Sequence, residues 1–530
     1  MFRVLVSDKL AAAGMDILRA APAIEVDETT GLTPHELAAR IPPYHGLIIR
    51  SGSRVTAEVI DAAANLRVIG RAGIGVDNID VEAATKKGVV VMNTPAGNNI
   101  TTAEHAISMM LSLARSIPQA TASMKSGKWE KGRFTGSEVY NKTLGIIGIG
   151  NIGSLVAERA LALKMHVIAY DPFISPERAQ RLGVELVNLD ELYARADFIS
   201  VHTPLTPETR GLVGADACAK MRQGVRVINC ARGGIVEEEA LAAAIREGKV
   251  AGAALDVFSR EPPPPDHPLI KLDQVICTPH LGAATDEAQT NVAIAIAQQI
   301  VNYLTDDVIQ DAVNVPSISP ELLEVLGPYL RLCEKLGSLQ AQLFAAAPRE
   351  LAIEYAGEVA DYDVKALTPA VLCGLLGRML ASHVVNYVNA PAIARERGIK
   401  VVESTTSKPR GFLNLVTVTV RGDKGVSIAA GAVFGQHVIR LVRINDFFLD
   451  ADPEGFILLF QNRDVPGVVG AIGTLLGEAK INIARLELGR ERIGGMAISL
   501  MHVDNEIPDA VIEKLRRLPN IVSAQLIRLQ

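Results

Sequence analysis

The sequence predicts an α/β chain with two doubly wound, Rossmann-like domains, followed by an α+β domain and a ferredoxin-like domain. Three observations favour this fold class. Short apolar runs alternate with alanine-rich helical stretches through about the first 300 residues, which is typical of a parallel sheet covered by helices. A glycine-rich turn, GIGNIG, lies between an apolar run and a helix at residues 148–153. Residues 454–530 follow the order β-α-β-β-α-β, which is ferredoxin-like.

Composition and charge restrict the class of protein. A length of 530 residues allows about three or four domains, and 48% apolar with 21% charged residues is typical of a globular chain. The net charge of −6, without a dense basic stretch, argues against a nucleic-acid partner. The apolar stretches are too short to span a bilayer, and the first residues run straight into a predicted strand. We therefore expect a soluble, cytoplasmic protein without a membrane or nucleic-acid partner.

The cysteines and histidines predict neither a disulfide framework nor a metal site. The five cysteines are odd in number and widely spaced, and the ten histidines form no H-x-x-x-H pair. This pattern fits a reducing compartment and predicts that the protein binds no metal.

Residues 1–97 and 285–316 are predicted to form the first domain. Its strands are expected at residues 3–7, 46–49, 66–70 and 89–93, and its helices at residues 11–20, 34–40, 57–64 and 81–87. A helix at residues 285–304 is expected to cross back to this domain and make it discontinuous. Polar loops follow the strands, at the edge where open α/β sheets bind ligands.

Residues 98–284 are predicted to form the second domain, which begins with a helix at residues 102–115. A strand at 144–149, the GIGNIG turn, a helix at 152–163 and a strand at 166–170 then follow one another. Asp171 ends this unit, about 20 positions after the glycines, which completes the context that a dinucleotide fingerprint requires.

The glycines and Asp171 predict NAD as the cofactor. Gly148 allows a tight turn, Gly150 lets backbone N–H groups reach a pyrophosphate, and Gly153 brings the helix close to the strand. The helix N-terminus adds partial positive charge. Asp171 can accept hydrogen bonds from both ribose hydroxyls and would repel a 2′-phosphate, which favours NAD over NADP.

Three further residues have side chains that suit the oxidation of an alcohol. They follow predicted strands at residues 225–229, 252–257 and 275–278, and are Arg232, Glu261 and His280. A guanidinium can clamp a carboxylate and polarise a keto oxygen, and a histidine can take a hydroxyl proton. A carboxylate beside an imidazole fixes its tautomer and raises its pKa. Each residue alone could be structural, but their common place at strand ends favours a site.

Residues 317–453 are predicted to form the α+β domain. Helices are expected at residues 320–347 and 368–381, strands at 349–356, 398–403, 412–421 and 425–434, and an exit segment at 447–455. A basic cluster of His437, Arg440 and Arg443 is either an anionic effector site or, as we favour, a surface of ion pairs. The last domain, residues 454–530, is expected to have strands at 456–461, 481–488, 497–503 and 521–528 and helices at 467–478 and 508–518.

The motifs in about the first 315 residues resemble those of the D-isomer-specific 2-hydroxyacid dehydrogenases. They are GIGNIG with Asp171, HTPLTPETRGL at residues 202–212, NCARGGIVEEEAL at 229–241, ALDVFSREPP at 254–263 and TPHLGAAT at 278–285. The resemblance implies an NAD-dependent enzyme with His280 as acid/base, Glu261 orienting His280, and Arg232 binding the carboxylate and keto group of the substrate.

Within that family the chain looks most like the long branch that oxidises 3-phospho-D-glycerate in serine biosynthesis. The stretches that carry this likeness are GRAGIGVDNID at residues 70–80, NTPAGNNITTAEHAISMMLSLAR at 93–115 and an ACT-like NRDVPGVVGAIGTLLGEAKINIARL at 462–486. The α+β domain resembles the intervening module of that branch. The likeness implies a homo-oligomer, a tetramer, with L-serine as an inhibiting effector. The alternatives are a glyoxylate or hydroxypyruvate reductase and, less favoured, an NAD-sensing corepressor, since corepressor relatives lack an ACT tail.

The resemblance also implies the residues that contact NAD and substrate. NAD contacts are expected at Gly148, Gly150, Asn151, Ile152, Asp171, Thr203, Cys230, Ala231, Arg232, Asp256, His280, Leu281, Gly282 and Ala283. Substrate contacts are expected at Arg50, Ser51, Gly73, Ile74, Gly75, Lys131 and Arg133. The cations would hold a phosphate and the glycine-loop N–H groups a carboxylate. Ile74 stands where some relatives have a Thr that touches cofactor, so we expect only a backbone contact there.

Two groups of these residues leave alternatives open. Lys131 and Arg133 could instead lie in a solvated loop, or could reach the site of a neighbouring subunit. Asp464, Val465 and Asn482 match ACT positions that bind an amino acid at a dimer interface, although many ACT-like units are only structural.

Overall fold

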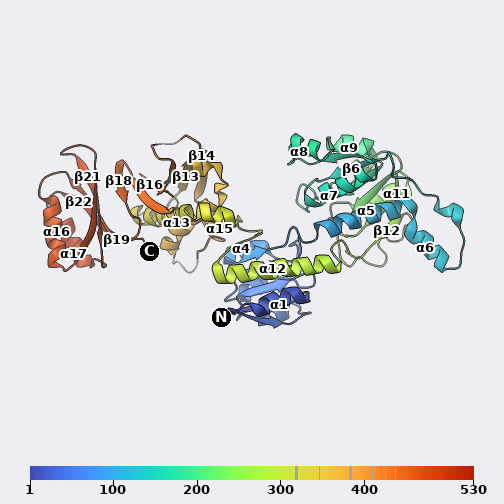
Figure 1. Ribbon diagram of the computed structural model, residues 1–530, viewed down its shortest axis with the longest axis horizontal. Coiled ribbons are helices and arrows are strands. Elements are labelled where there is room, and N and C mark those ends of the chain that lie inside the picture. The colour runs from blue at the N-terminus through green and yellow to red at the C-terminus, as the bar shows by residue number, and fades with distance from the viewer. Residues whose placement is uncertain are drawn as a thin grey trace.

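Four β-sheets organise the chain (Figure 1). The computed structural model describes all residues except 317–319, 345, 381–384, 409–410, 424, 436 and 530, and describes only the backbone of 320 and 321. Within these residues the sheets have five, seven, six and four strands in chain order, and the first two are parallel. The predicted fold class is confirmed. Among the described helices, none is both long enough and apolar enough to cross a bilayer.

The first sheet has the strand order β2-β1-β3-β4-β5, which is a doubly wound arrangement. Its strands are β1 (Phe2–Val6), β2 (Ile24–Glu28), β3 (Gly46–Ile49), β4 (Val68–Arg71) and β5 (Val90–Met92), and its helices are α1 (Ala12–Ala20), α2 (Pro34–Arg40), α3 (Ala57–Ala62) and α4 (Val81–Lys87). The sequence prediction missed β2. This edge strand, IEVDE, buries only Ile24, so it lacks the apolar run that identifies an interior parallel strand.

A long helix returns the chain to the first sheet. α12 (Asp286–Asp306) packs so closely on α1 that a Cβ on Gly14 would lie 2.6 Å from the Ala293 carbonyl oxygen. Beyond α12, Asn314 Oδ1 accepts a 2.9 Å hydrogen bond from the Val91 N–H. These contacts place the end of the predicted first domain beside its beginning, while the boundaries of the four domains stay predictions.

The second sheet has the strand order β12-β11-β10-β9-β6-β7-β8. Its strands are β6 (Thr143–Ile147), β7 (His166–Tyr170), β8 (Glu185–Leu186), β9 (Phe198–Val201), β10 (Val225–Asn229), β11 (Val250–Leu255) and β12 (Val275–Cys277). The surrounding helices are α5 (Asn99–Arg115), α6 (Ile117–Lys125), α7 (Asn151–Ala162), α8 (Pro176–Arg181), α9 (Leu189–Arg195), α10 (Ala215–Lys220) and α11 (Glu238–Arg246). The chain order reverses where β6 lies beside β9, and open α/β sheets bind ligands at such a point.

The third sheet has the strand order β14-β13-β15-β16-β17-β18. Its strands are β13 (Glu350–Gly357), β14 (Lys400–Thr406), β15 (Asn414–Gly422), β16 (Gly425–Phe434), β17 (Val438–Ile444) and β18 (Phe447–Ala451), with helices α13 (Pro320–Leu343), α14 (Leu367–Leu380) and α15 (Ala390–Glu396). The predicted exit segment at 447–455 is wrong, because its first half is β18. Asn445, with φ at 50°, turns β17 into β18, and an Asn-containing turn between apolar strands is a hairpin signature.

The fourth sheet is antiparallel, with the order β20-β21-β19-β22 expected of a ferredoxin-like unit. Its elements are β19 (Gly455–Arg463), α16 (Val468–Glu478), β20 (Ile483–Arg490), β21 (Met496–Val503), α17 (Asp509–Arg516) and β22 (Ile521–Leu529). One face packs on α16 and α17. The other face joins the core of the third sheet through the buried side chains of Ile457, Leu459, Ile498, Leu500, Ile527 and Leu529. Gln342, at the end of α13, also exchanges hydrogen bonds of 2.9 and 3.0 Å with the Arg528 backbone.

This shared core predicts how the chain responds to truncation. We expect a chain ending at residue 453 to aggregate, because removal of the fourth sheet uncovers apolar side chains of the third. A chain ending at residue 316, the matched control, keeps both parallel sheets with their helices and should stay dispersed. Light scattering and binding of a hydrophobic dye measure the difference. A dispersed 1–453 chain that binds no more dye than the full chain would contradict the shared core.

Candidate active site

The residues expected to bind NAD lie along one edge of the second sheet. Because all its strands are parallel, their carboxyl ends meet at that edge. From β7 across to β12 these ends carry Asp171, Gly148, Thr203, Cys230, Asp256 and His280. Arg232 follows β10, and Glu261 lies in the loop after β11. The sheet order therefore brings together residues that the sequence separates by more than a hundred positions.

The turn between β6 and α7 fits a dinucleotide pyrophosphate. Gly148 has a φ of 89°, and a Cβ on Gly153 would overlap the Gly148 carbonyl oxygen, so the helix can approach the turn only with glycine there. A Cβ on Gly150 would meet no protein atom within 4 Å. The open space at Gly150 faces the N-terminus of α7, where Asn151 and Ile152 have N–H groups without a partner inside the helix.

Asp171 and Thr203 flank this turn. The two oxygens of Asp171 accept hydrogen bonds from the Ile149 and Phe173 N–H groups, at 2.9 and 2.8 Å. These bonds fix the carboxylate, and each oxygen can still accept a further bond from a ribose hydroxyl. The hydroxyl oxygen of Thr203 is buried and has no hydrogen-bond partner among the described residues. A bound dinucleotide would supply one.

His280 and Glu261 form a hydrogen-bonded pair. His280 Nδ1 lies 2.7 Å from Glu261 Oε2, and Glu261 Oε1 accepts a 3.1 Å bond from the Phe258 N–H. Burial raises the pKa of Glu261, but the bonds from His280 and Phe258 outweigh burial and leave this pKa below its usual value. The ionised carboxylate selects the tautomer with hydrogen on Nδ1, so Nε2 is free to accept a proton.

Asp256 anchors the loop that carries His280. Its buried carboxylate accepts bonds from Thr278 Oγ1 and the Leu281 and Gly282 N–H groups, at 2.5, 2.7 and 2.8 Å. His105, from α5, lies 3.2 Å away. Burial raises the pKa of Asp256, but the bonds from His105, Thr278 and Leu281 together hold it below its usual value. The NAD contact expected at Asp256 stays a prediction.

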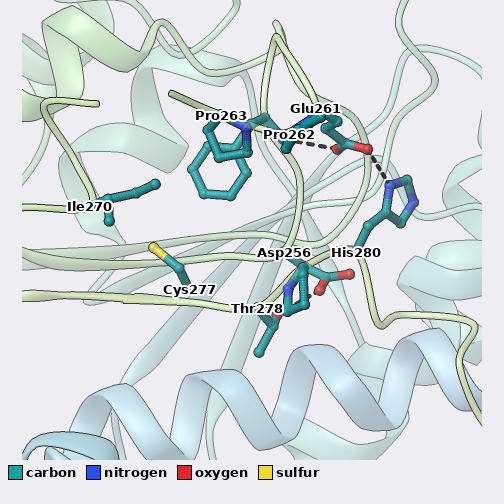
Figure 2. A pocket seen from close by; sticks show the side chains of 10 residues that line it. Asp256, Glu261, Pro262, Pro263, Ile270, Cys277, Thr278 and His280 are labelled. Atoms are coloured by element: carbon teal, nitrogen blue, oxygen red, sulfur yellow. Dashed lines mark hydrogen bonds and ion pairs between the residues drawn. The ribbon is translucent and has the colours of Figure 1, made fainter. Parts of the chain in front are cut away.

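A cavity of about 400 Å³ adjoins the His280–Glu261 pair. Figure 2 shows the pair at one end and Ile270, Cys277 and Pro263 toward the other. Burial raises the pKa of the Cys277 thiol to about 11, so this cysteine stays a neutral thiol at physiological pH. The far end of the cavity is therefore apolar and adds no acid or base to the pair.

Arg232 bridges the two parallel domains. Its Nε donates a 3.0 Å bond to Asp77 Oδ2, and a Cβ on Gly75 would overlap its Nη2. The Asn229 side chain holds the preceding loop through the Ala231 N–H and the Arg232 carbonyl. The neighbouring Cys230 thiol is buried, which raises its pKa and keeps it neutral.

Arg50 and Ser51 lie at the edge of the first sheet, just after β3. Asp8 holds this loop by accepting bonds from the Arg50 and Ser53 N–H groups, at 2.6 and 3.0 Å. Within the described residues, the Arg50 guanidinium makes one long bond, of 3.4 Å, to the Lys9 carbonyl oxygen. This weak bond leaves the side chain available to an anion.

Arg71 is a candidate site residue that the sequence prediction missed. It ends β4, its guanidinium lies against Gly73, and its buried Nε has no hydrogen-bond partner among the described residues. Burial, with repulsion from Arg232 and Arg50, lowers its pKa to about 10. An arginine at the carboxyl end of a parallel strand, in GRAGIG, is the sequence pattern that could have found it.

The loop after Arg71 presents backbone donors. The Gly73 carbonyl accepts from the Thr94 N–H at 3.0 Å, and the Ile74 carbonyl from Asn93 Nδ2 at 2.5 Å. Because N–H and C=O point in opposite directions in a trans peptide, the Ile74 and Gly75 N–H groups face away from Asn93 and Thr94. This geometry suits the predicted carboxylate contact.

Lys131 and Arg133 do not join this site within one chain. Both lie in η1 (Lys131–Phe134), and Arg133 Nη2 donates a 3.0 Å bond to Asp273. Asp273 precedes β12, whereas His280 follows it, so the arginine lies at the opposite edge of the parallel sheet. Contact with the site of a neighbouring subunit stays a prediction.

The predicted effector residues lie at opposite ends of α16. Asp464 and Val465 precede this helix and Asn482 follows it. Asp464 Oδ2 accepts bonds of 3.3 Å from Arg490 and the Gly494 N–H, and Asn482 Nδ2 donates to Asp504 at 2.8 Å. An 11-residue helix is about 16 Å long, so a small ligand cannot touch both ends in one chain.

The basic cluster of the third sheet is partly neutralised. Arg440 lies 3.6 Å from both Asp450 and Asp452, and the Arg443 guanidinium stacks over Phe448. These contacts favour a surface of ion pairs over an anion site.

Known proteins share this organisation from end to end. Family models match the D-isomer specific 2-hydroxyacid dehydrogenase NAD binding domain at residues 107–282, the D-3-phosphoglycerate dehydrogenase intervening domain at 325–445 and the ACT domain at 456–520. A D-3-phosphoglycerate dehydrogenase of Synechocystis sp. is 44% identical over 530 residues, covering 100% of this chain and 95% of the relative. One of Archaeoglobus fulgidus is 44% identical over 529 residues, covering 99% and 100%. The chain belongs to the D-3-phosphoglycerate dehydrogenase family.

A solved structure supports the cofactor of this dehydrogenase. A D-lactate dehydrogenase of Aquifex aeolicus, solved with NAD and lactic acid, superposes with a TM-score of 0.54 at 27% identity, covering 59% of this chain and 100% of that one. The match to the NAD binding domain agrees with the open turn at Gly150. NAD is thus the cofactor of the dehydrogenase, as the fingerprint predicts.

The two glycines of the turn should respond differently to a methyl group. We expect Gly150→Ala to fold normally but to lose NADH binding, because its Cβ enters only the space left for pyrophosphate. Gly153→Ala, the matched control, should unfold at lower temperature because its Cβ overlaps backbone. NADH fluorescence titration and thermal unfolding distinguish the two. Unchanged NADH affinity in Gly150→Ala would rule out this placement of the cofactor.

Proposed function

We propose that the dehydrogenase oxidises 3-phospho-D-glycerate to 3-phosphohydroxypyruvate, the first step of L-serine biosynthesis. The observation that carries the proposal is the arginine cluster of Arg50, Arg71 and Arg232, in which Arg232 bonds to Asp77 but the buried Arg71 Nε has no hydrogen-bond partner in the part of the chain that the structure describes. A substrate with both a phosphate and a carboxylate would supply the missing anions. The full-length relatives carry the name of this activity.

His280 acts as the general base. When bound, NAD supplies the acceptor for the hydride that leaves the hydroxyl-bearing carbon. His280 Nε2 takes the hydroxyl proton, and the Nδ1–H donates to Glu261 at 2.7 Å. Glu261 stays ionised and stabilises the imidazolium that forms.

Arg232 and the glycine loop hold the reacting end of the substrate. Arg232 binds the carboxylate and polarises the developing keto oxygen, while the Ile74 and Gly75 N–H groups donate hydrogen bonds to the carboxylate from the other side. Since Arg232 comes from the second domain and the loop from the first, closure of the domains assembles the site and excludes water.

Arg71 and Arg50 hold the phosphate. Both follow neighbouring strands of the first sheet, β4 and β3. A glyoxylate or hydroxypyruvate reductase needs the His280, Glu261 and Arg232 set but no phosphate site. The test is therefore selectivity for the phosphate.

The enzyme should prefer the phosphorylated substrate through Arg71. We expect kcat/KM for 3-phospho-D-glycerate to exceed that for D-glycerate by roughly 100-fold or more. Arg71→Met should cost about 2 kcal/mol, or roughly 30-fold, with the phosphorylated substrate. It should leave D-glycerate turnover nearly unchanged. Initial rates of NADH formation measure these ratios.

A second variant separates binding from chemistry. His280→Ala should abolish turnover of both substrates while NADH still binds. Equal kcat/KM for D-glycerate and 3-phospho-D-glycerate would exclude the proposed substrate and favour a reductase. Full activity of His280→Ala would exclude the base.

The ACT domain binds L-serine between two copies of the chain. Asp464 of one copy takes the ammonium group and Asn482 of the other takes the remaining polar groups, because one chain holds these residues at opposite ends of α16. The enzyme is thus a homo-oligomer, a tetramer in the form we favour, and serine inhibits by favouring one arrangement of its subunits.

Mixing two variants tests this shared site. We expect Asp464→Ala and Asn482→Ala each to lose inhibition by L-serine. Hybrid oligomers made by refolding the two together should regain part of it, because one interface site then has both native residues. The ratio of rates with and without L-serine is measured, with D-serine as control. Hybrids as insensitive as either parent would contradict a site between copies.

A further inference from the structure

A second histidine–glutamate pair lies behind the turn that carries Glu261. Glu238 is the first residue of α11, and His267 lies in the loop between β11 and β12. His267 Nε2 is 3.0 Å from Glu238 Oε2, and their side chains are only 8% and 18% exposed. Neither residue belongs to the sites described above. We infer that Glu238 and His267 are positioning residues that set the place of the Glu261 carboxylate against His280.

Hydrogen bonds show which ring nitrogen of His267 carries the hydrogen and which groups donate to Glu238. His267 Nδ1 accepts a 3.3 Å bond from the Leu269 N–H, so the ring hydrogen is on Nε2 and points at Glu238. The other oxygen of Glu238, Oε1, accepts a 2.6 Å bond from the Ser259 N–H. Glu238 thus receives one donor on each oxygen.

Glu238 and His267 contact the turn directly before Glu261. Ser259 is held by Glu238, and the Phe258 ring meets the His267 ring edge to face at 5.4 Å. The Phe258 N–H is the group that donates to Glu261 Oε1. Two consecutive residues therefore connect the buried pair to the carboxylate that orients His280.

The same turn also packs against the loop of Arg232. A Cβ on Gly233 would overlap the Phe258 carbonyl group. A shift of the turn would therefore move Glu261 and press on the residue after Arg232. Interiors pack too densely to absorb such a shift locally.

Only a carboxylate satisfies both donors at Glu238. A glutamine there would have one oxygen for two N–H groups, and its amide would place a donor against either Ser259 or His267. Glu238→Gln keeps the shape of the side chain, so its effect reports on the hydrogen bonds. Glu239, exposed and next on α11, is the matched control for the loss of charge.

The first test compares Glu238→Gln with Glu239→Gln. This inference rests on the roles proposed for Glu261 and His280. We expect Glu238→Gln to lower kcat roughly tenfold, because small displacements of an orienting group slow the chemical step, with little change in KM or NADH affinity. The acid limb of the kcat profile should move to lower pH, since an imidazole with a poorly placed carboxylate partner holds its proton less tightly. Glu239→Gln should match the parent. A parent that does not oxidise 3-phospho-D-glycerate would overturn the proposed function instead, and the comparison is then made with the 2-hydroxy acid that it does oxidise.

A double-variant cycle separates positioning from stability. In a Glu261→Gln background, Glu238→Gln should cause little further loss of kcat and no further movement of the acid limb. A tenfold loss of kcat in both backgrounds, or an acid limb that stays at the same pH in Glu238→Gln, would overturn the inference. The pair would then have a purely structural role.

Variants of His267 repeat the test if Glu238→Gln fails to fold. His267→Ala removes the donor to Glu238, whereas His267→Gln can donate to Glu238 and accept from Leu269 through one amide. We expect His267→Ala to behave as Glu238→Gln, and His267→Gln to recover most of kcat and the parent's acid limb. Equal loss in both variants would count against positioning by this pair.

Discussion

The buried carboxylate of Asp256 is the interaction on which the active-site edge depends. A carboxylate that is 1% exposed is costly unless donors surround it. Here Thr278 and two backbone N–H groups supply them, all from the segment that follows β12. Satisfying this charge therefore fixes the loop of His280 against the end of β11. The position of His280 therefore depends on the hydrogen bonds that satisfy a different residue, Asp256.

Asp256 is a buried charge whose hydrogen-bond donors surround it, whereas the arginine cluster carries positive charge that is only partly offset. Arg71 and Arg232 repel each other, and Asp77 and Asp8 offset only part of that charge. An incompletely neutralised cluster is costly to hold together without an anion. Under the proposed function, a substrate with a phosphate and a carboxylate would supply that charge, and its binding would be coupled to closure of the two domains.

The sequence predicted the features that local motifs encode. It did not predict contacts that form only when the two parallel domains pack together. GIGNIG with Asp171, and the three strand-end residues Arg232, Glu261 and His280, lie on recognisable motifs, so both the fold class and the His280–Glu261 pair were accessible. The Arg232–Asp77 bond joins residues 155 positions apart, and only the placement of two domains produces it. Arg133 follows the first helices of the second domain, but its bond to Asp273 places it at the edge of the second sheet opposite to His280.

The part of the chain that holds the third and fourth sheets contacts the first sheet and its helices through described residues such as Asn386 and Val388. Asn386 Nδ2 donates a 2.8 Å bond to the carbonyl of Gly88, the left-handed residue that ends α4. α4 begins next to the loop of Gly75 and Asp77, which meets Arg232. The fourth sheet cannot move independently, because it shares a core with the third. The third and fourth sheets would therefore move as one body, and two described contacts would carry that movement to the first sheet: the bond from Asn386 to the end of α4, and Val388, which is buried in the core of the first sheet.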